Sequence, residues 1–203
     1  MRPNVKSANS SMPEERSPVA ELEERGREIE KIKTEAKALT EHLGDEQFHW
    51  RPEAQSWSIA ECLDHLNRTN KLYLPILERA IEKGRARGLT GREPFRHGFL
   101  GDFFVRSMEP PPKKKFRAPQ SFLPVSDQPR EQVIAEFADM QERILSCIRA
   151  ADGLHLGKIK IPSPVTKLLR MSLGQGFALL TAHERRHLWQ AQQVKNNPNF
   201  PKA

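Results

Sequence analysis

The sequence predicts an all-α protein in which four long helices form a four-helix bundle with long irregular connections. Four segments carry apolar residues about every 3.6 positions, which is typical of helices with one buried face. The composition agrees, since 37% of the 203 residues are apolar and 29% are charged, as expected for helices with solvated outer faces. A bundle is the simplest arrangement that buries four such faces together. The long connections allow crossovers, so the helices need not simply alternate up and down.

The first predicted helix runs from about residue 17 to residue 43. Ser17 can cap its start, Pro18 suits the first helical position, and Gly44 offers a stop. Its apolar stripe is formed by Leu22, Ile29, Ile32, Ala36, Leu39 and Leu43. This spacing indicates an amphipathic helix that presents one face to a core.

The residues that precede this helix differ from the rest in composition. Residues 1–16 are polar and rich in Ser and Pro, and they contain no apolar signal segment. We therefore expect a flexible tail at 1–16, a single domain at 17–203 and a cytoplasmic protein. No run approaches the roughly 18 apolar residues that a membrane-spanning helix needs, so we expect no membrane partner.

The second predicted helix begins at Ser58. Ser58 and Glu61 match a capping box, in which each side chain bonds a main-chain amide of the other residue. The preceding stretch, residues 48–57, is predicted to be a loop. The apolar face continues to Ile81, with Pro75 inside it. Because proline lacks an amide hydrogen and its ring clashes with the preceding turn, we expect Pro75 to kink the helix or end it early.

The long connection after this helix is basic. Residues 84–128 have no sustained period, and the short apolar piece at 99–105 is predicted to form a helical turn or two. Lys and Arg outnumber Asp and Glu by ten to three between Lys83 and Arg117, which equals the net charge of +7. Two interpretations stay open: a solvated loop, or a module at 83–117 that binds nucleic acid or another anionic partner. No aromatic stacking motif or groove-entering helix accompanies the charges, so nucleic acid is the less favoured partner.

The last two predicted helices span about residues 128–150 and 173–195. Each again carries an apolar stripe at helical spacing. Between them, residues 151–164 are predicted to be extended and to lead into a turn, and a short helix is predicted at 165–171.

The two cysteines, Cys62 and Cys147, fall within helical patterns on or near apolar faces. Neither belongs to a C-x-x-C or zinc-finger spacing. We therefore expect small core side chains rather than a disulfide or thiolate ligands.

Two histidines four residues apart lie on the fourth predicted helix. The spacing of His183 and His187 stacks both imidazoles on one face, one turn apart. The same stripe includes Leu180 and Val194, so the pair is expected to face the bundle interior. Two such nitrogens can bind one ion at about 2.0–2.1 Å. The segment also matches the H-E-x-x-H template of zinc proteases, but it lacks a third ligand in a recognisable context.

A third histidine, His65, lies on the second predicted helix at the edge of its apolar face. If the second and fourth helices are neighbours, His65 can complete a set of three nitrogens with His183 and His187. Three protein ligands with open positions are typical of catalytic zinc sites, whereas closed four-ligand sites are structural. The alternative is that the three residues are hydrogen-bonded core histidines and hold no ligand.

Three stretches resemble motifs of the DinB/YfiT-like family. They are Trp57–Leu66 at the start of the second helix, the H-x-x-x-H-x-x-Q ending at His183–Gln190, and Trp50-Arg51-Pro52, which is similar to a W-x-P loop. The resemblance extends over about residues 20–195 and implies a four-helix bundle that is frequently a homodimer. It also implies a divalent metal ion, such as nickel or zinc, with His65, His183 and His187 as its ligands.

The same resemblance implies either of two activities on a small-molecule substrate. One is metal-dependent hydrolysis, and the other is S-transfer with a low-molecular-weight thiol. A metal with open positions suits both, because it lowers the pKa of bound water and can deprotonate a thiol. Two alternatives without catalysis remain, namely the anionic-partner module at 83–117 and a plain helical bundle.

Several other side chains lie near the histidines in the predicted arrangement. Gln190, one turn from His187, can orient a ligand or an imidazole. Glu61 and Asp64 could be carboxylates that support the metal ligands. Alternatively, Glu61 serves only in the helix cap and Asp64 lies on a solvated helix face. Glu184 points about 100° away from the ligand face, so we expect it to lie off the site. The tryptophans, Trp50, Trp57 and Trp189, are predicted to be packing residues or pocket walls, and His42, His49, His97 and His155 are assigned no role.

Overall fold

Four long helices form the bundle that the sequence predicts. The computed structural model describes residues 19–112, 118–166 and 169–202. The bundle helices are α1 (Ala20–Thr40), α3 (Ile59–Ala86), α5 (Arg130–Ala150) and α6 (Leu173–Lys195). The predicted tail at 1–16 and the predicted cap at Ser17 lie outside the described residues. The all-α fold class is confirmed.

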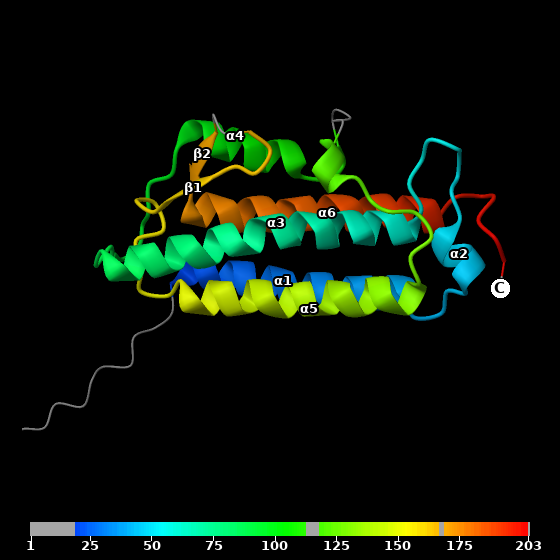
Figure 1. Cartoon of the computed structure of the whole chain (residues 1–203), viewed down its shortest axis with the longest axis horizontal. Helices are drawn as coiled ribbons and strands as arrows, with labels where there is room; N and C mark the ends of the chain where they lie inside the picture. Colours follow the sequence, from blue (N-terminus) through cyan, green and yellow to red (C-terminus); the bar gives the residue numbers. More distant parts are fainter. Residues whose placement is uncertain (1–18, 113–117, 167–168, 203) are drawn as a thin grey trace, which may run out of the picture.

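The helices do not alternate in direction. α1 and α6 run one way along the bundle, and α3 and α5 run the other way (Figure 1). The packed pairs are α1 with α5, α5 with α3, α3 with α6, and α6 with α1. Because the consecutive bundle helices α3 and α5 are parallel, the chain between them has to travel the length of the bundle. This crossover agrees with the expectation from the long connection. It also makes α3 and α6 antiparallel neighbours.

The crossover carries two short helices, α4 (Phe99–Met108) and the 3-10 turn η1 (Gln120–Phe122). α4 packs along α6, and η1 lies against α3 (Figure 1). Gly101 permits the close approach of α4, since a Cβ at this position would collide with the Gln175 side chain. The Gln175 Nε2 donates to the Gly98 carbonyl and to the Asp102 carboxylate, 2.8 Å away. The predicted helical piece at 99–105 is therefore a real helix, somewhat longer than expected.

Side-chain caps fix where two bundle helices begin. The predicted capping box at Ser58 and Glu61 is present, with contacts of 3.0 and 3.2 Å. A second box joins Ser172 and Gln175 at the start of α6, with the same two distances. Each cap contributes about 0.5–2 kcal/mol to helix stability. These caps set the register of α3 and α6, on which the three histidines lie.

Pro75 does not end α3, which continues for eleven further residues to Ala86. The residues on either side, Leu74 and Leu77, are fully buried in the bundle core. This tertiary packing outweighs the amide hydrogen bond that proline cannot make. The expectation of an early end was therefore wrong.

Two further segments differ from the predictions. Part of the predicted loop at 48–57 is helical, because α2 (Asp45–His49) buries Phe48 completely. In place of the predicted short helix at 165–171, β2 (Arg170–Ser172) pairs antiparallel with β1 (Lys160–Pro162). Residues 167–168 of that segment lie outside the described part. The pairing buries Met171 and Ile161, which a one-turn helix on the surface would leave exposed.

The core is one continuous apolar cluster between the helices. Cys62 and Cys147 are buried in it as free thiols, as expected. Burial raises the pKa of both thiols, that of Cys147 to about 11, so both stay protonated. None of the described helices is long and apolar enough to cross a membrane.

Candidate metal centre

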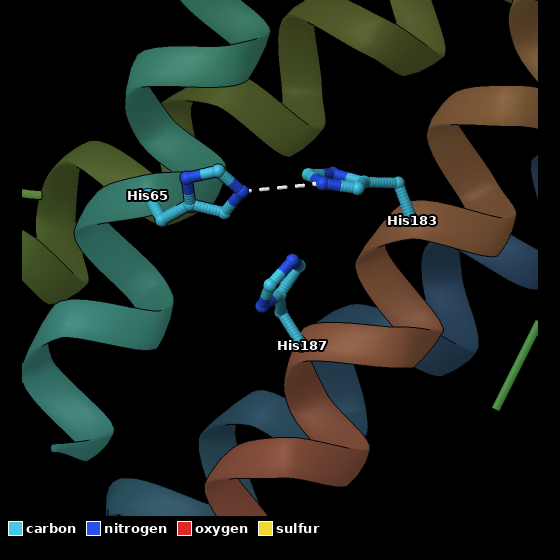
Figure 2. A group of neighbouring side chains, drawn as sticks. All are labelled: His65, His183 and His187. Atoms are coloured by element: carbon cyan, nitrogen blue, oxygen red, sulfur yellow. Dashed lines mark hydrogen bonds between the residues drawn. The ribbon is translucent and has the colours of Figure 1, made fainter. Parts of the chain in front are cut away.

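Three histidines from two helices converge inside the bundle. His65 on α3 and His183 and His187 on α6 point toward one another (Figure 2). One ring nitrogen from each lies within 4.8 Å of the corresponding nitrogens of the other two. The Nε2 atoms of His65 and His183 are 3.2 Å apart. The antiparallel contact of α3 with α6 thus brings together residues 118 positions apart in the chain.

The orientation of His65 is fixed by the crossover. Its Nδ1 lies 2.6 Å from the main-chain carbonyl oxygen of Phe122 in η1. A carbonyl oxygen only accepts, so Nδ1 carries the proton and donates. The Nε2 of His65 is then left with a lone pair directed at the other two rings. This is the arrangement by which proteins fix the tautomer of a metal-binding histidine.

The two α6 histidines have ring nitrogens without protein partners. The Nδ1 atoms of His183 and His187 are buried, and neither has a hydrogen bond to the described residues. Burial lowers the pKa of both imidazoles well below the usual value, and the neighbouring histidines and Arg186 lower it further. A hydrogen bond to the Gln190 side chain raises the pKa of His187 again, but only in part. Both rings are therefore neutral, which is the form that binds metal.

The imidazole of His65 is neutral as well. Burial lowers the pKa of His65, and the Phe122 carbonyl and the Asp64 carboxylate oppose this shift. Three neutral imidazoles thus share one small space, and the Nε2 atoms of His65 and His183 are at hydrogen-bonding distance. Ligand nitrogens at about 2.0–2.1 Å from a tetrahedral ion lie about 3.3 Å apart, close to the observed Nε2–Nε2 separation. The arrangement therefore has the spacing that a single divalent ion requires.

Trp57 forms one wall of the cluster. Its ring lies 4.8 Å from that of His65 and 5.6 Å from that of His187, between centroids. The tryptophan is half-buried, so it shields the imidazoles from solvent on this side. The other two tryptophans lie elsewhere, with Trp50 against Phe200 and Trp189 partly exposed.

The two carboxylates considered as supporting residues are buried and already occupied. Glu61 accepts two hydrogen bonds from Arg51, at 2.7 and 2.5 Å, besides its role in the cap. Asp64 accepts from the main-chain amide of Val125 at 2.7 Å. Neither residue lies on a solvated helix face. Asp64 instead holds the chain that follows η1 against α3, one residue before His65.

Glu184 lies off the histidine cluster, as expected, and it has a structural role in the core. Its Oε1 accepts hydrogen bonds from Asn70 Nδ2 at 2.8 Å and Gln141 Nε2 at 3.0 Å. These contacts join α6 to α3 and α5 in the core, and burial raises the Glu184 pKa to about 7. Because its carboxylate is engaged there, Glu184 is not placed as the general base that the H-E-x-x-H protease template requires.

Comparison with known families identifies the superfamily of the chain. A sequence model of the DinB superfamily matches residues 28–191. The chain belongs to the DinB superfamily. This DinB-superfamily protein is 23% identical over 161 residues to the uncharacterized protein YuaE of Bacillus subtilis (strain 168), which covers 75% of this chain and 86% of YuaE. The predicted family is therefore confirmed.

A solved structure shares the fold. YfiT from Bacillus subtilis, described as a probable metal-dependent hydrolase with an unusual four-helix bundle topology, superposes with a TM-score of 0.58. The match covers 92% of each chain at 13% sequence identity. At this identity the likeness concerns the fold alone. It agrees with the non-alternating helix directions of this DinB-superfamily protein.

The DinB-superfamily chain also contains a hydrogen-bonded Ser–His–Glu chain at the other end of α6. The Oγ of Ser172 is 2.7 Å from His97 Nδ1, and His97 Nε2 is 3.1 Å from Glu21 Oε2. Ser172 is completely buried and also caps α6, so its hydroxyl cannot act as a nucleophile. These residues tie α1 and the segment before α4 to the start of α6. The sequence assigns His97 no role, and its partners come from distant elements.

Proposed function

We propose that this DinB-superfamily protein binds one divalent metal ion through His65, His183 and His187 and acts as a metal-dependent hydrolase on a small-molecule substrate. The observation that carries the proposal is the convergence of three neutral imidazoles, one ring nitrogen of each lying within 4.8 Å of the other two, with the Nε2 atoms of His65 and His183 3.2 Å apart. Imidazole nitrogens suit zinc and nickel, and a set of three leaves coordination positions open. Nickel and zinc are therefore the two ions to test first.

The chain's own residues prepare the site for such an ion. The Phe122 carbonyl holds His65 in one tautomer, and Gln190 hydrogen-bonds His187. Trp57 excludes water from one side of the cluster. When bound, an ion with open positions supplies Lewis acidity toward water or a carbonyl group near neutral pH. Burial keeps the ligands unprotonated, so protons do not compete with the metal.

The hydrolase is favoured over the thiol S-transferase by the description of the structural neighbour YfiT as a probable metal-dependent hydrolase. Both activities would use the same three ligands. They differ in the second reactant, which is water in one case and a low-molecular-weight thiol in the other. Hydrolysis that requires no added thiol supports the proposal, whereas turnover only in the presence of thiol supports the transferase.

Metal analysis of the purified protein tests the first step. After loading with zinc or nickel and dialysis, the wild type should retain one ion per chain, measured by mass spectrometry. His65→Ala and His183→Ala should lose it, while His42→Ala, at an exposed turn, should not. A wild type without stoichiometric metal, or a folded His183→Ala with unchanged metal content, contradicts the proposal.

Activity tests the second step. A panel of chromogenic esters, amides and phosphate esters should reveal turnover by the loaded protein. A chelator should abolish the turnover, and re-addition of the ion should restore it. If the loaded protein binds metal but hydrolyses nothing in a broad panel with or without thiol, the metal site stands and the hydrolase does not.

A further inference from the structure

Helix α4 exposes an unusual amount of apolar surface. The exposed fractions are 77% for Phe99, 64% for Leu100, 60% for Phe103 and 36% for Phe104. Of the large apolar side chains exposed in the described residues, most lie on this one short helix. Single exposed apolar residues are ordinary, but a contiguous group marks a binding surface. We call these four residues the α4 apolar face.

The group is contiguous because of helical geometry. Phe99 and Phe103 are one turn apart, as are Leu100 and Phe104, so the four side chains form one patch. The opposite side of α4 packs on the bundle through Gly101, Val105 and Met108. α4 is therefore an amphipathic helix lying on the molecule with a second apolar face turned outward. Nothing in the described chain covers that face.

Positive charge borders the α4 apolar face. Arg96, three residues before Phe99, and Arg106, three residues after Phe103, are exposed, and neither forms an ion pair with the described residues. The acidic residues of the same stretch are held by other groups. Asp102 accepts from Gln175 at 2.8 Å, and Glu109 pairs with Arg185 at 2.5 Å. The outward surface thus combines large apolar side chains with arginines that have no counter-charge.

We propose that the α4 apolar face and its arginines dock this protein on an anionic lipid membrane surface. Apolar side chains on one face of a helix enter the boundary between headgroups and acyl chains, and basic residues beside them pair with anionic headgroups. The sequence-based expectation of no membrane partner concerned a spanning helix, and surface docking requires none.

Two other occupants fit the surface less well. In a two-fold contact with a second copy, the arginines of both chains would face one another without acidic partners. A nucleic acid would use the arginines, but burial of the aliphatic Leu100 contributes nothing to phosphate or base recognition. An anionic bilayer satisfies both the charge and the apolar character. The proposal does not depend on the metal or on hydrolysis.

Vesicle sedimentation of the full chain tests the proposal. The protein should sediment with equimolar phosphatidylglycerol–phosphatidylcholine vesicles and about tenfold less with phosphatidylcholine alone. Binding should weaken when NaCl rises from about 50 to about 500 mM, because salt screens the arginines. Phe99→Ser/Phe103→Ser and Arg96→Glu/Arg106→Glu should each reduce binding about tenfold or more.

Matched controls separate this surface from general apolarity or charge. Val165→Ser removes another exposed apolar side chain, and Lys31→Glu/Lys37→Glu reverses two exposed charges on α1, so both should bind as the wild type does. The altered residues are exposed, and circular dichroism should confirm unchanged folding. The proposal fails if anionic vesicles do not bind the protein or if both α4 variants bind normally. It also fails if the face instead mediates dimerisation or oligonucleotide binding, measured by analytical ultracentrifugation and fluorescence anisotropy.

Discussion

The Nδ1 of His65 donates a hydrogen bond of 2.6 Å to the main-chain carbonyl oxygen of Phe122. This contact joins a bundle helix to the crossover segment, 57 residues further along the chain. It fixes which nitrogen of His65 faces the other two histidines. The crossover is therefore part of the candidate site, although none of its side chains belongs to the three-histidine cluster.

Loosening η1 should weaken metal binding. Phe122 is buried, and its side chain anchors the turn that presents the carbonyl. Phe122→Ala should therefore lower the affinity for zinc or nickel about 10–100-fold, as is typical for loss of a group that orients a ligand. Competition with a chromogenic chelator measures the affinity.

Phe137→Ala provides the control for this variant. Phe137 is equally buried, but it lies on α5 and not in η1. Both truncations should lower the free energy of unfolding by about 3–5 kcal/mol. Only Phe122→Ala should change metal affinity. Equal affinities in the two variants would show that the crossover does not orient His65.

Glu184 should stabilise the fold because its side chain fills its place in the core and its Oε1 accepts two hydrogen bonds. Glu184→Leu leaves the amide groups of Asn70 and Gln141 without their shared acceptor, so it should lower the free energy of unfolding by about 2–4 kcal/mol. Glu184→Gln keeps an acceptor oxygen at the same place and should cost much less. Urea denaturation followed by circular dichroism compares the two. An equal loss in both variants would mean that the carboxylate charge matters, and not the hydrogen bonds.

The sequence correctly predicts the features that depend on local pattern, namely which side chains share a helix face and where a helix begins. The spacing of His183 and His187 on an amphipathic helix fixes their common face, and the capping box at Ser58 fixes where the helix of His65 begins. The adjacency of α3 and α6, on which the three-histidine set depends, follows from the family resemblance. Local pattern alone does not determine which helices pack together.

The parts that the sequence does not predict depend on distant contacts. The Phe122 carbonyl belongs to a segment whose apolar residues show no helical or strand periodicity. Every residue has a main-chain carbonyl, so the amino-acid type at position 122 does not reveal this contact. Pro75 looks like a helix breaker, yet packing of its neighbours in the core keeps α3 continuous. The strand at Arg170–Ser172 exists only because Lys160–Pro162 pairs with it. In each case tertiary structure overrides a local preference.

His97 should make stability depend on pH. The hydrogen bond to Glu21 raises the pKa of His97 above its usual value near 6.5, although burial opposes the shift. A histidine whose pKa is raised by folding stabilises the protein fully below the unfolded pKa, and this contribution is lost as pH rises through the folded pKa. The wild type should therefore exceed His97→Gln in unfolding free energy more at pH 6 than at pH 9. Chemical denaturation at both pH values measures the difference, and a gap independent of pH would contradict this assignment.

Two glycine substitutions should have opposite effects, because their surroundings differ. A methyl group at Gly101 would collide with the Gln175 side chain and push α4 away from α6, so Gly101→Ala should lower stability and expose α4 to limited proteolysis. Gly26 lies inside α1 with open space around it, so Gly26→Ala should raise the unfolding free energy by about 0.5–1 kcal/mol through its higher helix propensity. Thermal denaturation and trypsin digestion of both variants distinguish the effects. If Gly101→Ala left the digestion rate unchanged, the close packing of α4 on α6 would not be what holds this helix in place.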